Sequence, residues 1–123
     1  MIGYTTIGVR NMESACKFYS ELLAELGCKQ LFGMDRIQFF GTAPDAPMLA
    51  VCIPYDEKAP KSGNGTMIAI PAGGPADVDR LYAKAIKLGA TDDGAPGPRN
   101  PVFYGAYVRD ADGNKLCFYE MKM

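Results

Sequence analysis

Apolar and polar residues alternate along the chain in short stretches typical of strands, and twice they switch to the longer period of a helix. Residues 2–9 are rich in β-branched side chains whose alternation predicts a strand. After Asn11, a favourable N-cap, apolar side chains recur at helical spacing, and Gly27 stands where a C-cap glycine belongs. We therefore expect a strand followed by an amphipathic helix over residues 12–26.

Three further strand-like runs follow this helix, around residues 29–34, 37–41 and 48–54. Residues 56–64 contain few apolar side chains and several Gly and Pro residues, which is typical of a linker. The first module, about residues 1–55, is thus predicted to contain a strand, a helix and three strands.

The pattern then starts again. Residues 66–70 predict a strand, and residues 75–88 predict a helix with Pro75 at its first position. The segment 93–101 is so rich in Gly and Pro that we expect a loop there.

The chain ends in two strand-like runs, residues 103–109 and 115–121, and the Asp112-Gly113 pair between them is a strong hairpin signal. The second module therefore covers about residues 65–123. A period of about sixty residues indicates two copies of one supersecondary unit. We expect both modules to form a single domain, residues 1–123.

Composition narrows the class of protein. With 123 residues, 48% of them apolar and 22% charged, the chain can bury a core of its own. The net charge of −1 and the scattered Lys and Arg residues argue against a nucleic-acid partner. The chain has no apolar run of the length of a membrane span and no signal-peptide pattern, so we expect a cytoplasmic protein without a membrane partner. Its four cysteines form no C-x-x-C pair, and we interpret them as reduced thiols.

Two motifs resemble those of a known family. Residues 4–19 are similar to the opening strand and helix of the vicinal-oxygen-chelate superfamily, which includes glyoxalase I, bleomycin-resistance proteins and extradiol dioxygenases. Residues 110–116 resemble its closing "D-P-D-G-N" hairpin, with Ala111 in place of proline. The resemblance implies an α+β fold in which two β-α-β-β-β modules form a curved, cup-shaped, mainly antiparallel sheet with outer helices. It also implies a homodimer.

The same resemblance places the metal ligands of the family in this chain. Its two first-strand histidines would fall on Tyr4 and Thr66 and its terminal glutamate on Cys117. A fourth ligand would fall near Ala50, with Met48 and Cys52 as alternative positions. None of these positions keeps a histidine or a carboxylate, and the chain contains no histidine at all. We therefore expect no metal site and no cofactor.

The absence of histidine also removes the Ser-His-Asp and Cys-His pairs of nucleophilic enzymes. A carboxylate with a raised pKa or an activated Cys117 could still serve as a base or nucleophile. The sequence leaves open whether the protein is an enzyme.

Several side chains are candidates for lining the cup and binding a small molecule. Arg99 suits a carboxylate or phosphate ligand, although a solvated loop arginine is the simpler interpretation. Tyr104 and Tyr107 lie on opposite faces of one strand, so only one of them can face the cup. The candidate residues are Tyr4, Thr6, Met48, Ala50, Thr66, Ile68, Arg99, Tyr104, Tyr107 and Cys117.

The leading hypothesis is metal-independent binding of a small molecule. An alternative is a lyase or isomerase resembling lactoylglutathione lyase, although the metal ion that polarises the substrate in such enzymes would lack its ligands. A metal-free enzyme that uses a tuned Cys or Glu is a third hypothesis.

Overall fold

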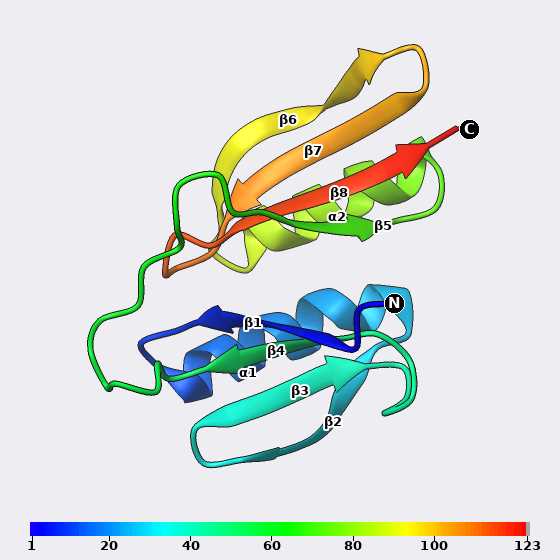
Figure 1. The fold of residues 1–123 in the computed structure, drawn as a ribbon. Coiled ribbons are helices and arrows are strands. Elements are labelled where there is room, and N and C mark those ends of the chain that lie inside the picture. Colours follow the sequence, from blue (N-terminus) through cyan, green and yellow to red (C-terminus); the bar gives the residue numbers. More distant parts are fainter. Residues whose placement is uncertain (123) are drawn as a thin grey trace. The chain divides into compact units, whose positions relative to one another are not determined.

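The computed structural model describes residues 1–122 of the chain (Figure 1). It contains two compact units, Met1–Ser62 and Gly63–Met123. The boundary between them falls inside the segment 56–64, where the sequence predicts a linker. Each unit has its own sheet and its own helix, and each is described by itself.

The first unit follows the predicted order of elements. They are β1 (Tyr4–Gly8), α1 (Met12–Leu23), the 3₁₀ turn η1 (Ala24–Leu26), β2 (Lys29–Met34), β3 (Ile37–Gly41) and β4 (Met48–Cys52). The strands form one sheet in the order β1-β4-β3-β2, in which β1 runs parallel to β4 and the other pairs are antiparallel.

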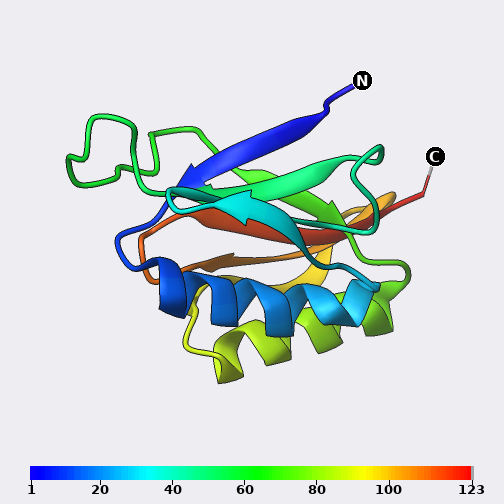
Figure 2. The same ribbon diagram turned by 90° about the horizontal axis from the view of Figure 1, so that it is seen from below.

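Helix α1 forms and ends as its sequence predicts. The Asn11 side chain accepts a hydrogen bond from the backbone N–H of Ser14 at 2.9 Å, and Gly27 adopts a left-handed φ of 76° after the last turn. The apolar side of α1 lies along one face of the sheet (Figures 1 and 2), where Tyr19 packs against Phe40 with ring centroids 6.4 Å apart.

The second unit repeats this plan. Its elements are β5 (Ile68–Pro71), α2 (Pro75–Lys87), β6 (Thr91–Asn100), β7 (Phe103–Arg109) and β8 (Lys115–Met121), and its strand order is β5-β8-β7-β6. Strand β5 is parallel to β8, and the remaining pairs are antiparallel. The Asp77 side chain accepts a 2.8 Å hydrogen bond from the Gly74 N–H at the start of α2, with Pro75 at the first helical position. Val78, Leu81 and Ala85 form the buried side of α2.

The α+β fold of two β-α-β-β-β modules is therefore confirmed. The closing hairpin also forms as predicted, because the Asp110 side chain accepts hydrogen bonds from the backbone N–H groups of Asp112 and Asn114, both at 2.9 Å. No helix within residues 1–122 is long and apolar enough to cross a membrane.

One element was predicted wrongly. Residues 93–101 do not form a loop, because most of them belong to β6. This strand lies at the edge of its sheet, where prolines cost no ladder hydrogen bond if their nitrogens face outward, and its pairing with β7 shifts register at three places. An edge strand with bulges can thus form from a sequence whose composition is typical of loops.

Candidate functional site

Each sheet has one face covered by the helix of its own unit and one face that this helix leaves uncovered, called here the helix-free face. In the second sheet, Cys117 of β8 lies in register between Ala69 of β5 and Tyr107 of β7. Residues in register point to the same side of a sheet, so these three side chains share the helix-free face.

Tyr107 is the centre of this surface. The Arg99 guanidinium lies 5.3 Å from the centroid of its ring and the Lys115 ammonium 5.2 Å, both within the range of cation–π contacts. The Tyr107 hydroxyl is hydrogen-bonded to the Cys117 thiol. We call Arg99, Tyr107, Lys115 and Cys117 the Tyr107 cluster.

Burial controls ionisation in the Tyr107 cluster. Burial raises the pKa of Tyr107 above its ordinary value, and Cys117 raises it further. Burial also raises the pKa of the Cys117 thiol, and the hydrogen bond with Tyr107 and the charges of Arg99 and Lys115 offset this only in part. Both groups are therefore neutral at physiological pH, so Cys117 lacks the lowered pKa of an activated nucleophile.

Backbone groups hold the Arg99 side chain against the ring. Arg99 donates hydrogen bonds to the carbonyls of Gly97 at 2.9 Å and Ala95 at 2.6 Å. Gly94 leaves room for this arrangement, since a Cβ atom there would lie 2.8 Å from the Tyr107 ring and 3.4 Å from the Arg99 guanidinium. The bulged backbone of β6 thus positions the guanidinium.

A carboxylate, Asp93, and a third basic side chain, Arg109, border the cluster. The Asp93 carboxylate lies 3.0 Å from Arg109 Nε and 3.4 Å from Lys115 Nζ. Desolvation raises the pKa of Asp93, but the hydrogen bonds from Lys115 and Arg109 outweigh it and bring that pKa below its ordinary value. Asp93 is therefore ionised at neutral pH.

The structure decides between the two tyrosines of β7. Tyr104 donates a 2.7 Å hydrogen bond to Asp79 of α2, so it lies on the face covered by the helix. Ile68 pairs with Leu116 on that same face. Tyr104 and Ile68 thus lie opposite Tyr107 and do not join the other candidate residues of this sheet.

Thr66 also lies away from the cluster. It precedes β5, and its N–H faces the Gly63 carbonyl at 3.5 Å in a turn. Ala69 pairs with Cys117 just as Thr6 pairs with Ala50, so the residue of the second module that corresponds to Tyr4 is Met67. The motif alignment was therefore wrong by one residue at Thr66, and strand alternation turns such a slip into a change of face.

The remaining candidates gather on the helix-free face of the first sheet. Tyr4 pairs with Met48 and Thr6 with Ala50, and Ala50 pairs with Phe39 on its other side. Phe39 is in contact with the ring of Tyr4, with centroids 4.9 Å apart, and is stacked with Phe32 at 4.6 Å. Of these three rings only Tyr4 was among the predicted site residues, although the alternation from Ile37 to Phe39 is enough to place Phe39 on the same face.

These residues do not fit a metal of the type that the superfamily binds. The corresponding positions of the two modules are Tyr4 with Ala50 and Met67 with Cys117, which offer a phenol, a thioether and a neutral thiol. A phenol and a thiol are weak ligands unless they lose a proton, and a thioether is a soft neutral ligand that suits none of the usual divalent ions well. Within residues 1–122, no three His, Cys, Asp or Glu side chains lie close enough together to hold a metal ion.

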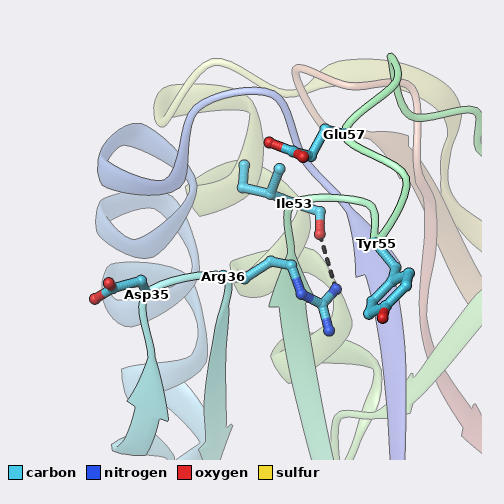
Figure 3. Close-up of a pocket in the computed structure, with 5 residues that line it drawn as sticks. All are labelled: Asp35, Arg36, Ile53, Tyr55 and Glu57. Carbon is cyan, nitrogen blue, oxygen red and sulfur yellow. Dashed lines mark hydrogen bonds between the residues drawn. The ribbon is translucent and has the colours of Figure 1, made fainter.

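A pocket of about 340 Å³ in the first unit contains another arginine–tyrosine pair (Figure 3). Arg36 donates a 3.0 Å hydrogen bond to the Ile53 carbonyl, and its guanidinium lies 5.3 Å from the Tyr55 ring centroid. Asp35 and Glu57 also line the pocket. The sequence analysis did not single out any of these residues.

Comparison with known proteins agrees with this architecture. The sequence profile of the Glyoxalase/Bleomycin resistance protein/Dioxygenase superfamily matches residues 1–118. The chain belongs to this superfamily. No curated protein matches the chain significantly.

Several solved structures resemble the chain over nearly its full length. A glyoxalase/bleomycin resistance protein from Albidiferax ferrireducens T118 is 30% identical, with a TM-score of 0.89 and 99% of each chain covered. A superfamily enzyme from Burkholderia phytofirmans PsJN is 18% identical, with a TM-score of 0.79 and 98% of each chain covered. Protein ATC0852 from Agrobacterium tumefaciens is 22% identical, with a TM-score of 0.77, and the match covers 100% of this chain and 98% of that one. The last two show the shared fold alone.

Proposed function

We propose that this superfamily protein binds a small organic molecule without a metal ion, at the helix-free face of the second sheet. The observation that carries the proposal is the Tyr107 cluster, where two cationic side chains and a buried thiol surround one aromatic ring. Helix α2 packs on the opposite face, so it does not cover this ring, which is partly exposed. An aromatic ring beside a few fixed polar groups is typical of small-molecule sites.

The helix-free face of the first sheet supplies apolar surface for the same kind of ligand. Tyr4 and Phe32 are about half exposed, with 53% and 46% of their surfaces accessible, on either side of the buried Phe39. Ring faces and edges of this kind bind the apolar part of a small molecule. The residues that we propose for binding are Tyr4, Thr6, Met48, Ala50, Arg99, Tyr107 and Cys117.

We propose binding rather than lyase chemistry because the side chains available favour it. Abstraction of a proton beside a carbonyl requires an electrophile for the developing enediolate and a base. Cys117 is protonated at neutral pH, and Tyr107 is a neutral phenol. These groups are hydrogen-bond donors and acceptors for a ligand rather than an acid–base pair poised near pH 7.

We also propose that the protein forms a homodimer. Met34, which is 67% exposed, joins Phe32 and Tyr4 on the apolar face of the first sheet, and strands β1 and β2 are the edges of that sheet. Exposed apolar surface next to open strand edges is commonly covered by a symmetric partner.

The test is a ligand screen by ¹H–¹⁵N NMR on protein purified without added metal. We expect small organic molecules to shift the amide signals of Ala69, Tyr107 and Cys117, and a chelator to leave the shifts unchanged. The matched variants are Tyr107→Phe, which should weaken binding, and Tyr104→Phe on the opposite face, which should not. One metal ion per chain, together with ligand shifts that disappear on chelation, would contradict the proposal.

A further inference from the structure

We infer that the ligand of the Tyr107 cluster carries an anionic group, a carboxylate or a phosphate, that is bound by Arg99 and Lys115 beside the Tyr107 ring. This inference rests on the proposed function and narrows it to one chemical class. Three observations support it: the hydrogen-bonding of Arg99, the charge balance of the surface, and the contrast with the Arg36 pair.

Arg99 is oriented but not neutralised. Two of its N–H groups donate to the carbonyls of Gly97 and Ala95, which are uncharged, and its guanidinium lies 5.3 Å from the centroid of the Tyr107 ring and is hydrogen-bonded to that side chain. Within residues 1–122, no carboxylate oxygen comes within 4.0 Å of this guanidinium. The guanidinium keeps further N–H groups for a ligand, and its planar fork matches the two oxygens of a carboxylate or phosphate.

Positive charge exceeds negative charge on this part of the sheet. Arg99, Arg109 and Lys115 are cationic, and among residues 1–122 Asp93 is the one carboxylate found in contact with this group. The neighbouring carboxylate of Asp92 does not add negative charge to this face, because it accepts a 2.9 Å hydrogen bond from Tyr82 of α2. An incoming anion would complete the charge balance of this surface.

Cation–π contacts position both charges before a ligand arrives. Arg99 and Lys115 approach one ring at 5.3 and 5.2 Å, so neither long side chain has to be ordered from a fully flexible state on binding. A Cβ atom at Gly94 would intrude on both Tyr107 and Arg99, and the glycine keeps this place clear.

The Arg36 pair is a natural control on the same chain. Arg36 has the same guanidinium-to-ring distance of 5.3 Å and the same type of hydrogen bond to a carbonyl. However, its pocket is lined by Asp35 and Glu57 and contains no second cation. Among residues 1–122, an arginine therefore lies over a tyrosine ring at both Tyr55 and Tyr107, but the Tyr107 cluster alone combines this contact with a surplus of positive charge.

The experiment uses probes that share one ring and differ in charge. Benzoate, phenyl phosphate and neutral benzamide are titrated into ¹⁵N-labelled protein, and Kd is obtained from the amide shifts of Tyr107 and Cys117. We expect at least one anion to bind about tenfold more tightly than benzamide and to weaken as salt is added, because charge-assisted hydrogen bonds contribute about that much. The stronger of the two anions distinguishes a carboxylate from a phosphate ligand.

Two matched variants assign the effect to the cluster. Arg99→Gln should weaken the favoured anion by about tenfold and leave benzamide unchanged, whereas Arg36→Gln should change neither. Lys115→Gln provides a second test if Arg99→Gln fails to give a folded spectrum. Equal binding of anions and benzamide, or equal losses in Arg99→Gln and Arg36→Gln, would overturn the inference and leave the proposed function standing. If none of the three probes shifts the cluster, the inference is overturned, and the wider screen then decides the proposed function.

Discussion

Tyr104 donates a 2.7 Å hydrogen bond to Asp79 and so fastens strand β7 to helix α2, while Tyr107, three residues further along the same strand, lies among cations on the other face. The two tyrosines of this strand thus lie on opposite faces of the same sheet. Tyr104 contributes to the packing of its unit, and Tyr107 is the tyrosine that we propose for ligand binding.

This separation predicts opposite results for the same substitution. Tyr104→Phe should lower the free energy of unfolding slightly and leave ligand Kd unchanged, because it removes only the hydrogen bond to Asp79. Tyr107→Phe should raise Kd by severalfold, because it removes the hydroxyl that bonds Cys117. Urea denaturation and NMR titration of both variants provide the check, and a binding defect in Tyr104→Phe would contradict the assignment of faces.

The structure predicts a loss of stability at alkaline pH. The hydrogen bonds to Asp92 and Asp79 raise the pKa values of Tyr82 and Tyr104 above their ordinary value. A raised folded-state pKa stabilises the protein fully below the unfolded-state pKa of about 10, and this stabilisation is lost as pH rises through the folded-state value. The free energy of unfolding should therefore fall from about pH 10 upward.

Absorbance of tyrosinate and urea denaturation, both measured across this range of pH, test the prediction. The double variant Tyr82→Phe/Tyr104→Phe should show a shallower decline than the natural protein. Parallel declines in the two proteins would mean that other groups cause the alkaline instability.

Asp93→Asn should strengthen anion binding and weaken the fold. The substitution removes the carboxylate that contacts Arg109 and Lys115 and so increases the positive charge beside Tyr107. We expect the Kd of the favoured anion to fall by about two- to fivefold at low salt, with a lower urea midpoint at pH 7. Asp35→Asn in the first unit is the control, and an equal gain of affinity there would point to net charge alone.

Gly94→Ala should displace the Tyr107 ring, because the added methyl group would overlap with it. Gly94 has a φ of 151°, and an added Cβ would lie 2.8 Å from the Tyr107 ring. We expect a stability loss of about 1–3 kcal/mol and weaker ligand binding. Gly3→Ala is the matched control because no atom lies within 4 Å of a Cβ built there. Retention of full affinity in Gly94→Ala would show that the position of the ring does not limit binding.

The proposed homodimer depends on the apolar face of the first sheet. Met34→Lys should shift sedimentation at micromolar concentration from dimer to monomer, because a buried unpaired ammonium at an interface costs several kcal/mol. Tyr55→Lys changes a residue that is 87% exposed in a loop outside the sheet and should leave the dimer intact. A natural protein that sediments only as a monomer would contradict the proposal.

Most of the fold could be predicted from the sequence because local signals and the hydrophobic period agree. Asn11, Gly27 and Pro75 fix the ends of the helices, and Asp110 fixes the last hairpin. Strand β6 escaped prediction because its prolines and glycines are tolerated only through its edge position and bulges, which no local pattern reveals.

The candidate site was predicted less completely, since strand alternation divides residues into two sets but does not say which set the helix covers. From the sequence, Tyr104 and Tyr107 were therefore equally good candidates for the site, and the hydrogen bond to Asp79 in the structure places Tyr104 on the face that the helix covers. A slip of one residue likewise selected Thr66 in place of Met67. Lys115 escaped notice because its place beside Tyr107 comes from pairing between β7 and β8 rather than from sequence spacing.

The irregular course of β6 has a further consequence, for aggregation. An open strand edge can template the addition of strands from other molecules, which is the first step toward fibrils. Pro96 and Pro98 cannot donate backbone hydrogen bonds, and three register shifts break the straight row of donors and acceptors that an incoming strand would need. The same bulged backbone that presents Arg99 to Tyr107 thus makes this edge of the second sheet a poor template for fibril growth.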